Sequence, residues 1–158
     1  MEAVALDAAS LIEASSTQIL DDVLIRICDL MQLSSTQFSL AEQHYHAICE
    51  WLGARESVLY LYQPDLYPQG SVALGTTVRP QRGDEYDVDL VCELAIDPKS
   101  VTRPVQLLDL IEARMRESER YRNRLERKKR CLRVNYEHDF HLDILPGCPD
   151  EEAGGTCL

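Results

Sequence analysis

Three aspartates in short apolar segments constrain this chain more than any other feature of its sequence. Asp87 and Asp89 lie in the alternating segment 86–94, and Asp143 lies in the segment 140–145. Alternation of apolar and polar residues predicts β-strands, in which residues two apart share a face. An isolated carboxylate is costly to desolvate, so buried strands carry one only where something pairs with it. A divalent cation is the partner that we expect.

The spacing of Asp87 and Asp89 suits a shared metal ion. Their Cα atoms lie about 6.5–7 Å apart on a strand, so the two side chains can converge. Carboxylate oxygens favour Mg²⁺, with Mn²⁺ as the alternative, and Asp143 would complete a two-metal site for phosphoryl transfer. An Asp-x-Asp on its own more often marks a solvated strand. An EF-hand is excluded because Cys92 stands where that loop needs glycine.

A glycine–serine pair, Gly70 and Ser71, precedes the Asp-x-Asp. Glycine lets backbone amides approach a ligand closely, and the N–H and hydroxyl of Ser71 can both donate to a phosphate. The spacing Gly70-x-x-x-x-Gly75 imitates a P-loop, but Thr76 replaces the required lysine. A Walker-type NTPase is therefore excluded, and segment 70–77 is expected to form a strand or a tight turn.

Charge is distributed unevenly along the 158 residues, whose net charge is -11. The acidic excess lies in the first 100 residues, which argues against a broad nucleic-acid surface, whereas residues 114–133 hold 10 of the 16 Lys and Arg. The simplest interpretation of this basic segment is a solvated helix with ion pairs such as Glu112–Arg116 and Glu126–Arg130. Contact with phosphates is the alternative.

The six cysteines include no Cys-x-x-Cys, which argues against a zinc ribbon or a redox motif. A zinc site would have to come from Cys131, His138, His141 and Cys148, which lack a recognised ligand spacing. No apolar run reaches membrane-spanning length, so a cytoplasmic protein without a membrane partner is expected.

Helical periodicity predicts helices that begin at a cap on Ser15 or Ser16, near residue 36, and near residue 105. We expect them to cover residues 16–31, 36–51 and 105–130, with strands at 86–94, 131–136 and 140–145 and a turn at 137–138. Residues 58–69 are expected to be irregular. The core is assigned to residues 1–150, and the acidic, glycine-rich tail 151–158 is expected to be disordered.

Two runs then resemble a known family. Pro68-Gln-Gly-Ser-Val-Ala-Leu-Gly-Thr-Thr-Val-Arg-Pro80 and Glu85-Tyr-Asp-Val-Asp-Leu-Val91 closely resemble the bacterial CD-NTases. These enzymes are relatives of cyclic GMP–AMP synthase and oligoadenylate synthase in the DNA polymerase β-like nucleotidyltransferase superfamily. The resemblance covers residues 68–146 well. It implies an α/β (α+β) nucleotidyltransferase fold, in which a mixed or antiparallel sheet carries the carboxylates and a long N-terminal helical arm precedes it.

The resemblance also implies roles for the singled-out residues. Gly70 and Ser71 would hold the donor triphosphate, Asp87 and Asp89 would ligate Mg²⁺, and Asp143 would complete the second metal site and help to activate the acceptor hydroxyl. The implied product is a cyclic di- or trinucleotide made from ATP, GTP or pyrimidine triphosphates, a second messenger in anti-phage defence (CBASS).

Family members commonly carry a C-terminal helical lobe beyond the carboxylates, and we expect this lobe to be absent from this chain. We therefore expect a fragment or one half of a split enzyme, with a C-terminal partner half or a regulatory protein as partner. Two alternatives stay open: a nucleotidyltransferase that acts on RNA ends or on a protein, and a catalytically silent module that binds a partner.

Overall fold

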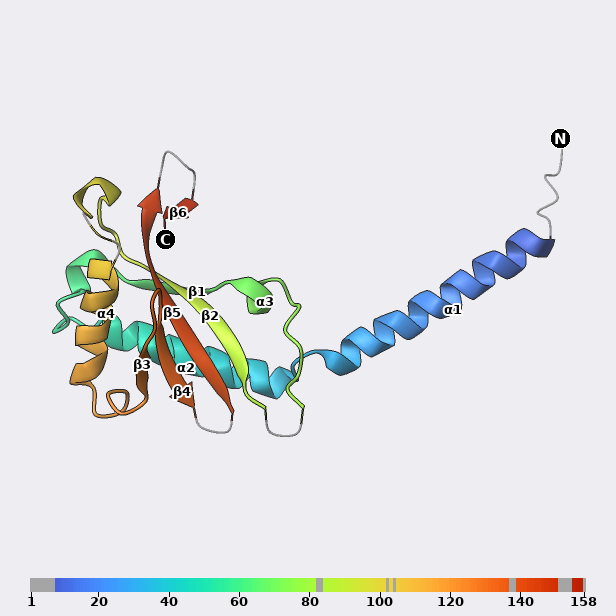
Figure 1. Cartoon of the computed structure of the whole chain (residues 1–158), viewed down its shortest axis with the longest axis horizontal. Helices are drawn as coiled ribbons and strands as arrows, with labels where there is room; N and C mark the ends of the chain where they lie inside the picture. The colour runs from blue at the N-terminus through green and yellow to red at the C-terminus, as the bar shows by residue number, and fades with distance from the viewer. Residues whose placement is uncertain are drawn as a thin grey trace. The chain divides into compact units, whose positions relative to one another are not determined.

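The computed structural model describes residues 8–81, 84–101, 103, 105–136, 139–150 and 155–157. The chain divides into two compact units, residues 1–32 and residues 33–158. Helix α1 (Ala8–Met31) belongs to the first unit, and the sheet with its helices forms the second (Figure 1).

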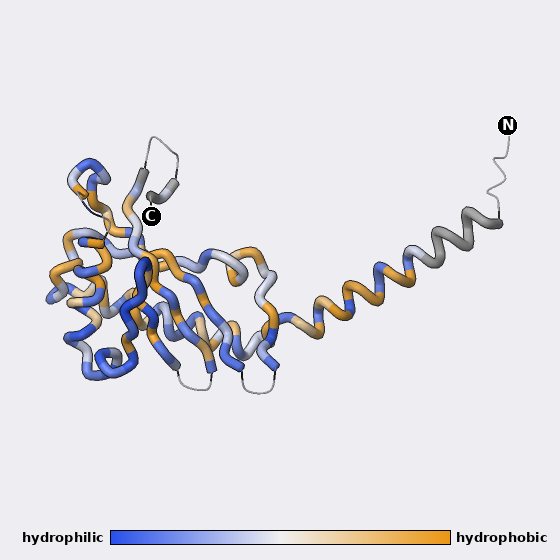
Figure 2. Tube along the Cα trace, viewed as in Figure 1, coloured by the Kyte–Doolittle hydropathy of each residue, from blue (hydrophilic) through white to orange (hydrophobic). Residues whose placement is uncertain are grey.

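Helix α1 begins earlier than the sequence predicts, so the expected cap at Ser15 or Ser16 lies inside the helix. Apolar residues recur along it (Figure 2). Several of these side chains are exposed, among them Ile19, Val23 and Leu30. Helices of globular proteins owe most of their stability to burial of an apolar face, and the described residues do not cover this one. No described helix has the length and apolar character that a membrane span requires.

Helix α2 (Ser35–Leu52) confirms the second predicted helix, with bounds that differ by one residue at each end. Ser34 caps it through a capping box with Gln37: the Ser34 hydroxyl accepts from the Gln37 N–H at 3.2 Å, and the Ser34 N–H donates to the Gln37 side chain at 3.0 Å. Its buried face consists of Ala41, Tyr45, Ile48 and Leu52.

The sheet has the strand order β1-β2-β5-β4-β3. Its strands are β1 (Asp65–Pro68), β2 (Tyr86–Glu93), β5 (Phe140–Asp150), β4 (Leu132–Tyr136) and β3 (Leu125–Arg127). The central pair, β2 and β5, is parallel, and the pairs β1–β2, β5–β4 and β4–β3 are antiparallel. The sheet is therefore mixed, as predicted.

One face of this sheet is apolar and the other is polar. Val88 and Leu90 of β2 and Leu142 and Ile144 of β5 are buried in one core with side chains of α2 and α4 (Val105–Glu117). Because successive strand residues alternate in direction, the intervening residues of β2 and β5 point to the opposite face. The core thus determines which face receives the acids.

Helix α4 ends at Glu117, so the prediction of a helix over residues 105–130 is wrong beyond that point. Turns follow, in which the Tyr121 and Arg122 N–H groups donate to the Ser118 carbonyl. Tyr121 is buried in the core, and this turned path brings Leu125–Arg127 beside β4 as strand β3. Burial of one aromatic ring prevails here over the helical charge pattern.

The basic segment is largely engaged in ion pairs. Arg116 pairs with Glu112 at 2.6 Å, as the i,i+4 spacing predicts. Arg127 bridges Glu112 at 2.5 Å and Asp109 at 2.7 Å. The second predicted pair, Glu126–Arg130, required the helix to continue, and Glu126 instead pairs with Lys128 at 2.5 Å.

Other elements differ from the sequence prediction. The segment expected to be irregular contains β1 and the 3-10 turn η1 (Tyr60–Tyr62), and a second such turn is η2 (Pro98–Ser100). Within the tail expected to be disordered, β6 (Gly155–Cys157) pairs with the end of β5, so that prediction is wrong for these three residues. Residues 151–154 and 158 and the predicted turn at 137–138 lie outside the described residues.

Arg114 joins α2 to α4. Its guanidinium donates to the Trp51 carbonyl from Nε at 3.2 Å and from Nη2 at 3.1 Å, and pairs with Glu117 at 2.6 Å. The guanidinium also lies 3.8 Å from the centre of the Trp51 ring, and the indole N–H donates back to the Arg114 carbonyl at 3.1 Å. This reciprocal contact locks the two helices that cover the sheet.

We expect Arg114→Ala to lower the free energy of unfolding by about 2 kcal/mol, because it leaves the Trp51 carbonyl without its donors and removes the cation–π contact. Urea denaturation followed by circular dichroism measures this loss. Arg116→Ala, which breaks an exposed ion pair, is the control and should cost below about 1 kcal/mol. Equal losses of stability in the two variants would contradict the conclusion that Arg114 holds α2 and α4 together.

Candidate active site

The parallel pairing of β2 with β5 brings the three predicted acids to one face of the sheet. Asp89 lies directly opposite Asp143, and Asp87 lies two residues earlier on β2, opposite His141. The face is the polar one, opposite the face that packs against α2 and α4. The side chain of Asp87 is 57% exposed and that of Asp143 only 13%. The site is therefore open to solvent at Asp87 and shielded from it at Asp143.

Arg133 of β4 also belongs to this site, although the sequence analysis did not single it out. It lies opposite Asp143 in the antiparallel β4–β5 pair. Its Nε and Nη2 donate to the two oxygens of Asp143, each at 2.7 Å, and Nη2 donates to Asp87 at 2.9 Å. The two hydrogen bonds to Asp143 favour the charged form and hold the pKa of Arg133 above its usual range.

Alternation could have located Arg133. It stands between the apolar residues Leu132 and Val134, so the reasoning that placed Asp143 on a polar face applies equally to it. The strand order was the missing information, because only adjacency of β4 and β5 places Arg133 opposite Asp143.

Asp89 experiences the opposite electrostatic environment. Burial raises the pKa of its carboxyl, the neighbouring Asp143 and Asp87 carboxylates raise it further, and Arg133 offsets part of this effect. Among the described residues, no three acidic, histidine or cysteine side chains lie close enough together to enclose a metal ion. The guanidinium of Arg133, which bonds both Asp143 and Asp87, lies between them instead.

The glycine–serine turn reaches the same acids. Segment 70–77 begins with the one-turn helix α3 (Gly70–Ala73) rather than a strand. Gly70 has φ +62°, and a Cβ there would lie 2.9 Å from Oδ2 of Asp89. The Gln69 N–H donates to the Asp89 carbonyl at 2.8 Å, which ties the turn to β2. The structure therefore brings the predicted residue Gly70 against Asp89.

Ser71 is held by two threonines. The Thr77 hydroxyl donates to Ser71 Oγ at 3.0 Å, and the Thr76 N–H donates to the Ser71 carbonyl at 2.8 Å. Because Ser71 Oγ already accepts a hydrogen bond, its own proton is available to a further acceptor.

Two more side chains lie near the acids. His141 pairs through Nε2 with Glu85 at 2.6 Å, and its buried Nδ1 has no hydrogen-bond partner within the described part of the chain. Burial and the nearby Asp143 carboxylate raise the pKa of the Cys131 thiol. In the zinc alternative, His138 lies outside the described residues.

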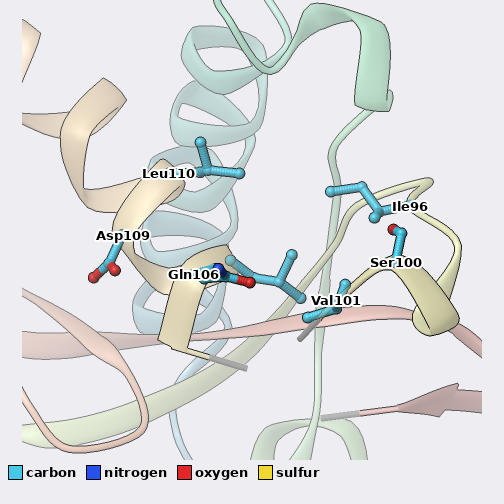
Figure 3. A pocket seen from close by; sticks show the side chains of 7 residues that line it. Ile96, Ser100, Val101, Gln106, Asp109 and Leu110 are labelled. Carbon is cyan, nitrogen blue, oxygen red and sulfur yellow. The ribbon is translucent and has the colours of Figure 1, made fainter. Parts of the chain in front are cut away.

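A separate pocket of about 440 Å³ lies between the segment that follows β2 and the start of α4. Figure 3 shows Ile96, Ser100 and Val101 facing Gln106 and Leu110 across it. None of the predicted site residues lines this pocket. The residues predicted to form the site therefore lie on the sheet face, outside this pocket.

Comparison with known proteins gives a consistent family. Residues 64–146 match the family described as cyclic GMP-AMP synthase DncV-like, nucleotidyltransferase domain. A c-di-GMP synthase of Roseivirga ehrenbergii is 36% identical over 143 residues, which are 87% of this chain and 36% of that protein. The cyclic dinucleotide synthase CdnG of Bradyrhizobium diazoefficiens is 32% identical over 140 residues, which are 85% of this chain and 32% of that protein. The chain thus spans about a third of the length of these curated relatives.

Solved structures agree with this assignment. The Bradyrhizobium CdnG in complex with GTP superimposes with a TM-score of 0.62 at 32% identity, over 76% of this chain and 35% of that one. Escherichia coli DncV in its 3'-deoxy GTP bound form gives a TM-score of 0.57 at 15% identity, over 80% of this chain and 50% of that one. At this identity, the likeness concerns the fold alone. The predicted polymerase β-like nucleotidyltransferase fold is confirmed, and the chain belongs to the DncV-like nucleotidyltransferases, the bacterial CD-NTases.

Proposed function

We propose that this chain is the nucleotide- and metal-binding lobe of an enzyme that makes a cyclic di- or trinucleotide from nucleoside triphosphates. The observation that carries the proposal is the meeting of Asp87, Asp89 and Asp143 on one sheet face, with Gly70 against Asp89. The relatives named c-di-GMP synthase and cyclic dinucleotide synthase support the reaction class. We propose ATP, GTP or a pyrimidine triphosphate as substrates and cytoplasmic anti-phage signalling (CBASS) as the role.

The three carboxylates have the donor chemistry that a hard divalent cation prefers. All their donors are oxygens. Burial and then the neighbouring carboxylates raise the pKa of Asp89, and a cation among the acids would offset both effects. We infer that Asp87, Asp89 and Asp143 hold Mg²⁺, with Mn²⁺ as the alternative. When bound, such ions neutralise triphosphate charge and stabilise the attacking and leaving oxygens.

The remaining steps fall to the protein's own side chains. The Ser71 hydroxyl, whose oxygen accepts a hydrogen bond from Thr77, would donate a hydrogen bond to a phosphate oxygen. Gly70 allows that phosphate to approach the backbone closely. We infer from the resemblance to the CD-NTases that Asp143 helps to activate the attacking hydroxyl by accepting its proton. The side chain of Asp143 is 13% exposed, so it is better shielded from water than that of Asp87.

The relatives are about three times as long as the matched region, so we propose that the activity needs a second, helical lobe or a partner half. Positioning contributes most of the catalysis in phosphoryl transfer, and one open sheet face cannot orient both a base and an acceptor. The exposed apolar side chains of α1, such as Ile19, Val23 and Leu30, offer a surface for that lobe.

We expect the chain on its own to bind Mg²⁺ and nucleoside triphosphate weakly and to form little product. Incubation with labelled triphosphates, phosphatase treatment and thin-layer chromatography measure a phosphatase-resistant cyclic species. Robust cyclic-nucleotide synthesis by this chain alone would contradict the requirement for a second lobe. A labelled RNA or protein product would instead favour the other nucleotidyltransferase reactions.

The double variant Asp87→Asn with Asp89→Asn should weaken Mg²⁺-dependent triphosphate binding at least about tenfold, because it removes two anionic ligands. Isothermal titration with and without Mg²⁺ measures this. Asp65→Asn, which alters an exposed acid on β1, is the control and should bind as the unaltered chain does. If phage protection survived the double change, the role would be that of a silent binding module.

Gly70→Ala and Gly75→Ala separate backbone strain from crowding of the acid. Both glycines have positive φ, +62° and +66°, so each substitution should cost about 1 kcal/mol of stability. Only the Cβ at Gly70 meets Asp89, whereas the Cβ at Gly75 meets nothing within 4 Å. Urea denaturation should show similar losses, while titration should show weakened triphosphate binding for Gly70→Ala alone. Equal triphosphate binding by the two variants would contradict the expectation that a Cβ at Gly70 disturbs Asp89.

A further inference from the structure

We propose that Arg133 is a built-in counter-ion of the carboxylate site, which occupies the space between Asp143 and Asp87 until a divalent cation displaces it. This inference rests on the proposed metal site. In this proposal, the Arg133 guanidinium is bound to Asp143 and Asp87 before a metal ion binds. The metal ion therefore has to compete with Arg133 for these two carboxylates.

The geometry of the guanidinium supports this role. Three hydrogen bonds of 2.7, 2.7 and 2.9 Å join it to both oxygens of Asp143 and to one oxygen of Asp87. An ion ligated by these two acids has to lie between their oxygens, which is where the Nη2 nitrogen lies. The guanidinium and the ion therefore compete for space as well as for charge.

Partial burial strengthens the ion pair that a metal ion would have to break. The side chains of Arg133 and Asp143 are 21% and 13% exposed, so their ion pair is shielded more than a surface pair and is correspondingly stronger. The side-chain carboxylate of Asp89, by contrast, accepts no hydrogen bond from the described residues. Its carboxylate can therefore bind a cation directly, whereas the carboxylates of Asp143 and Asp87 can do so only after Arg133 leaves.

The exit of Arg133 needs only a side-chain rotation. The β4–β5 register fixes the backbone of Arg133 opposite Asp143, and the buried neighbours Leu132 and Val134 hold that register. The exposed Asp87 lies at the open side of the site, so the guanidinium can turn toward solvent without disturbing the sheet.

Arg127 provides a matched control elsewhere in the same unit. It bridges two carboxylates, Glu112 and Asp109, at 2.5 and 2.7 Å, and is 26% exposed. Its removal changes the net charge of the chain as much as removal of Arg133 does, but it leaves Asp87, Asp89 and Asp143 untouched.

The experiment is a titration of the full chain with Mn²⁺ in the absence of nucleotide, in which electron paramagnetic resonance counts the free ion. Arg133→Ala should bind Mn²⁺ at least about tenfold more tightly than the unaltered chain, since the ion no longer displaces a charge-assisted pair. Arg127→Ala should bind as the unaltered chain does. An equal gain in both variants, or no gain in Arg133→Ala, would overturn the proposal.

Thermal melting gives a second readout. In EDTA, Arg133→Ala should melt below the unaltered chain because three acids repel one another without a cation, and Mn²⁺ should restore its Tm more than it raises that of the unaltered chain. If the alanine variant does not fold, Arg133→Lys carries the test. It keeps the charge but loses the two-pronged contact, and should show an intermediate Mn²⁺ affinity.

Asp89→Asn, added to each protein, separates the two proposals. If the unaltered chain and Arg133→Ala bind Mn²⁺ equally and Asp89→Asn abolishes the binding in both, the counter-ion role is wrong and the metal site stands. If no protein binds Mn²⁺, or if the binding survives Asp89→Asn, the metal site itself is wrong and the counter-ion proposal falls with it.

Discussion

Parallel pairing of β2 with β5 is the interaction on which the rest of the structure depends. The register that buries Val88 and Leu142 on the helix side is the same register that sets Asp89 opposite Asp143 on the other side. Because side chains alternate along a strand, a slip of one residue would bury the acids and expose the core. Formation of the core and assembly of the site are thus one event, and the helices α2 and α4 enforce both.

Alternation within a strand could be recognised in the sequence, whereas the order of strands could not. The segments around Asp87 and Asp143 showed their polar and apolar faces through their own residues. Arg133 had the same alternation, but its role required knowing that β4 is the neighbour of β5. Edge elements were missed for a related reason: β1 buries one residue, Leu66, and contains Pro68, so it carries little strand pattern of its own. The end of α4 was missed because the buried Tyr121 stands among charged residues that favour a helix.

The glycine–serine turn shows a similar division. Its composition predicted a close approach of the backbone to a ligand, and Gly70 does adopt a positive φ. What the composition could not reveal is that a side chain of the protein, the Asp89 carboxylate, already lies against the same glycine. The absence of a Cβ at Gly70 therefore leaves room for the Asp89 carboxylate, and the proposed phosphate contact depends on the same absence.

The openness of the sheet face links the counter-ion to the proposed second lobe. With Asp87 more than half exposed, water reaches that side of the site, so a released Arg133 guanidinium can be solvated there. A lobe that covers the face would expel that water and strengthen every charge interaction beneath it, which penalises both an unpaired guanidinium and an uncompensated acid. In the proposed enzyme, exchange of the guanidinium for a metal ion would therefore be easiest before such a lobe closes. On this physical ground, the open lobe of that enzyme would bind its cation before the covering lobe closes over it.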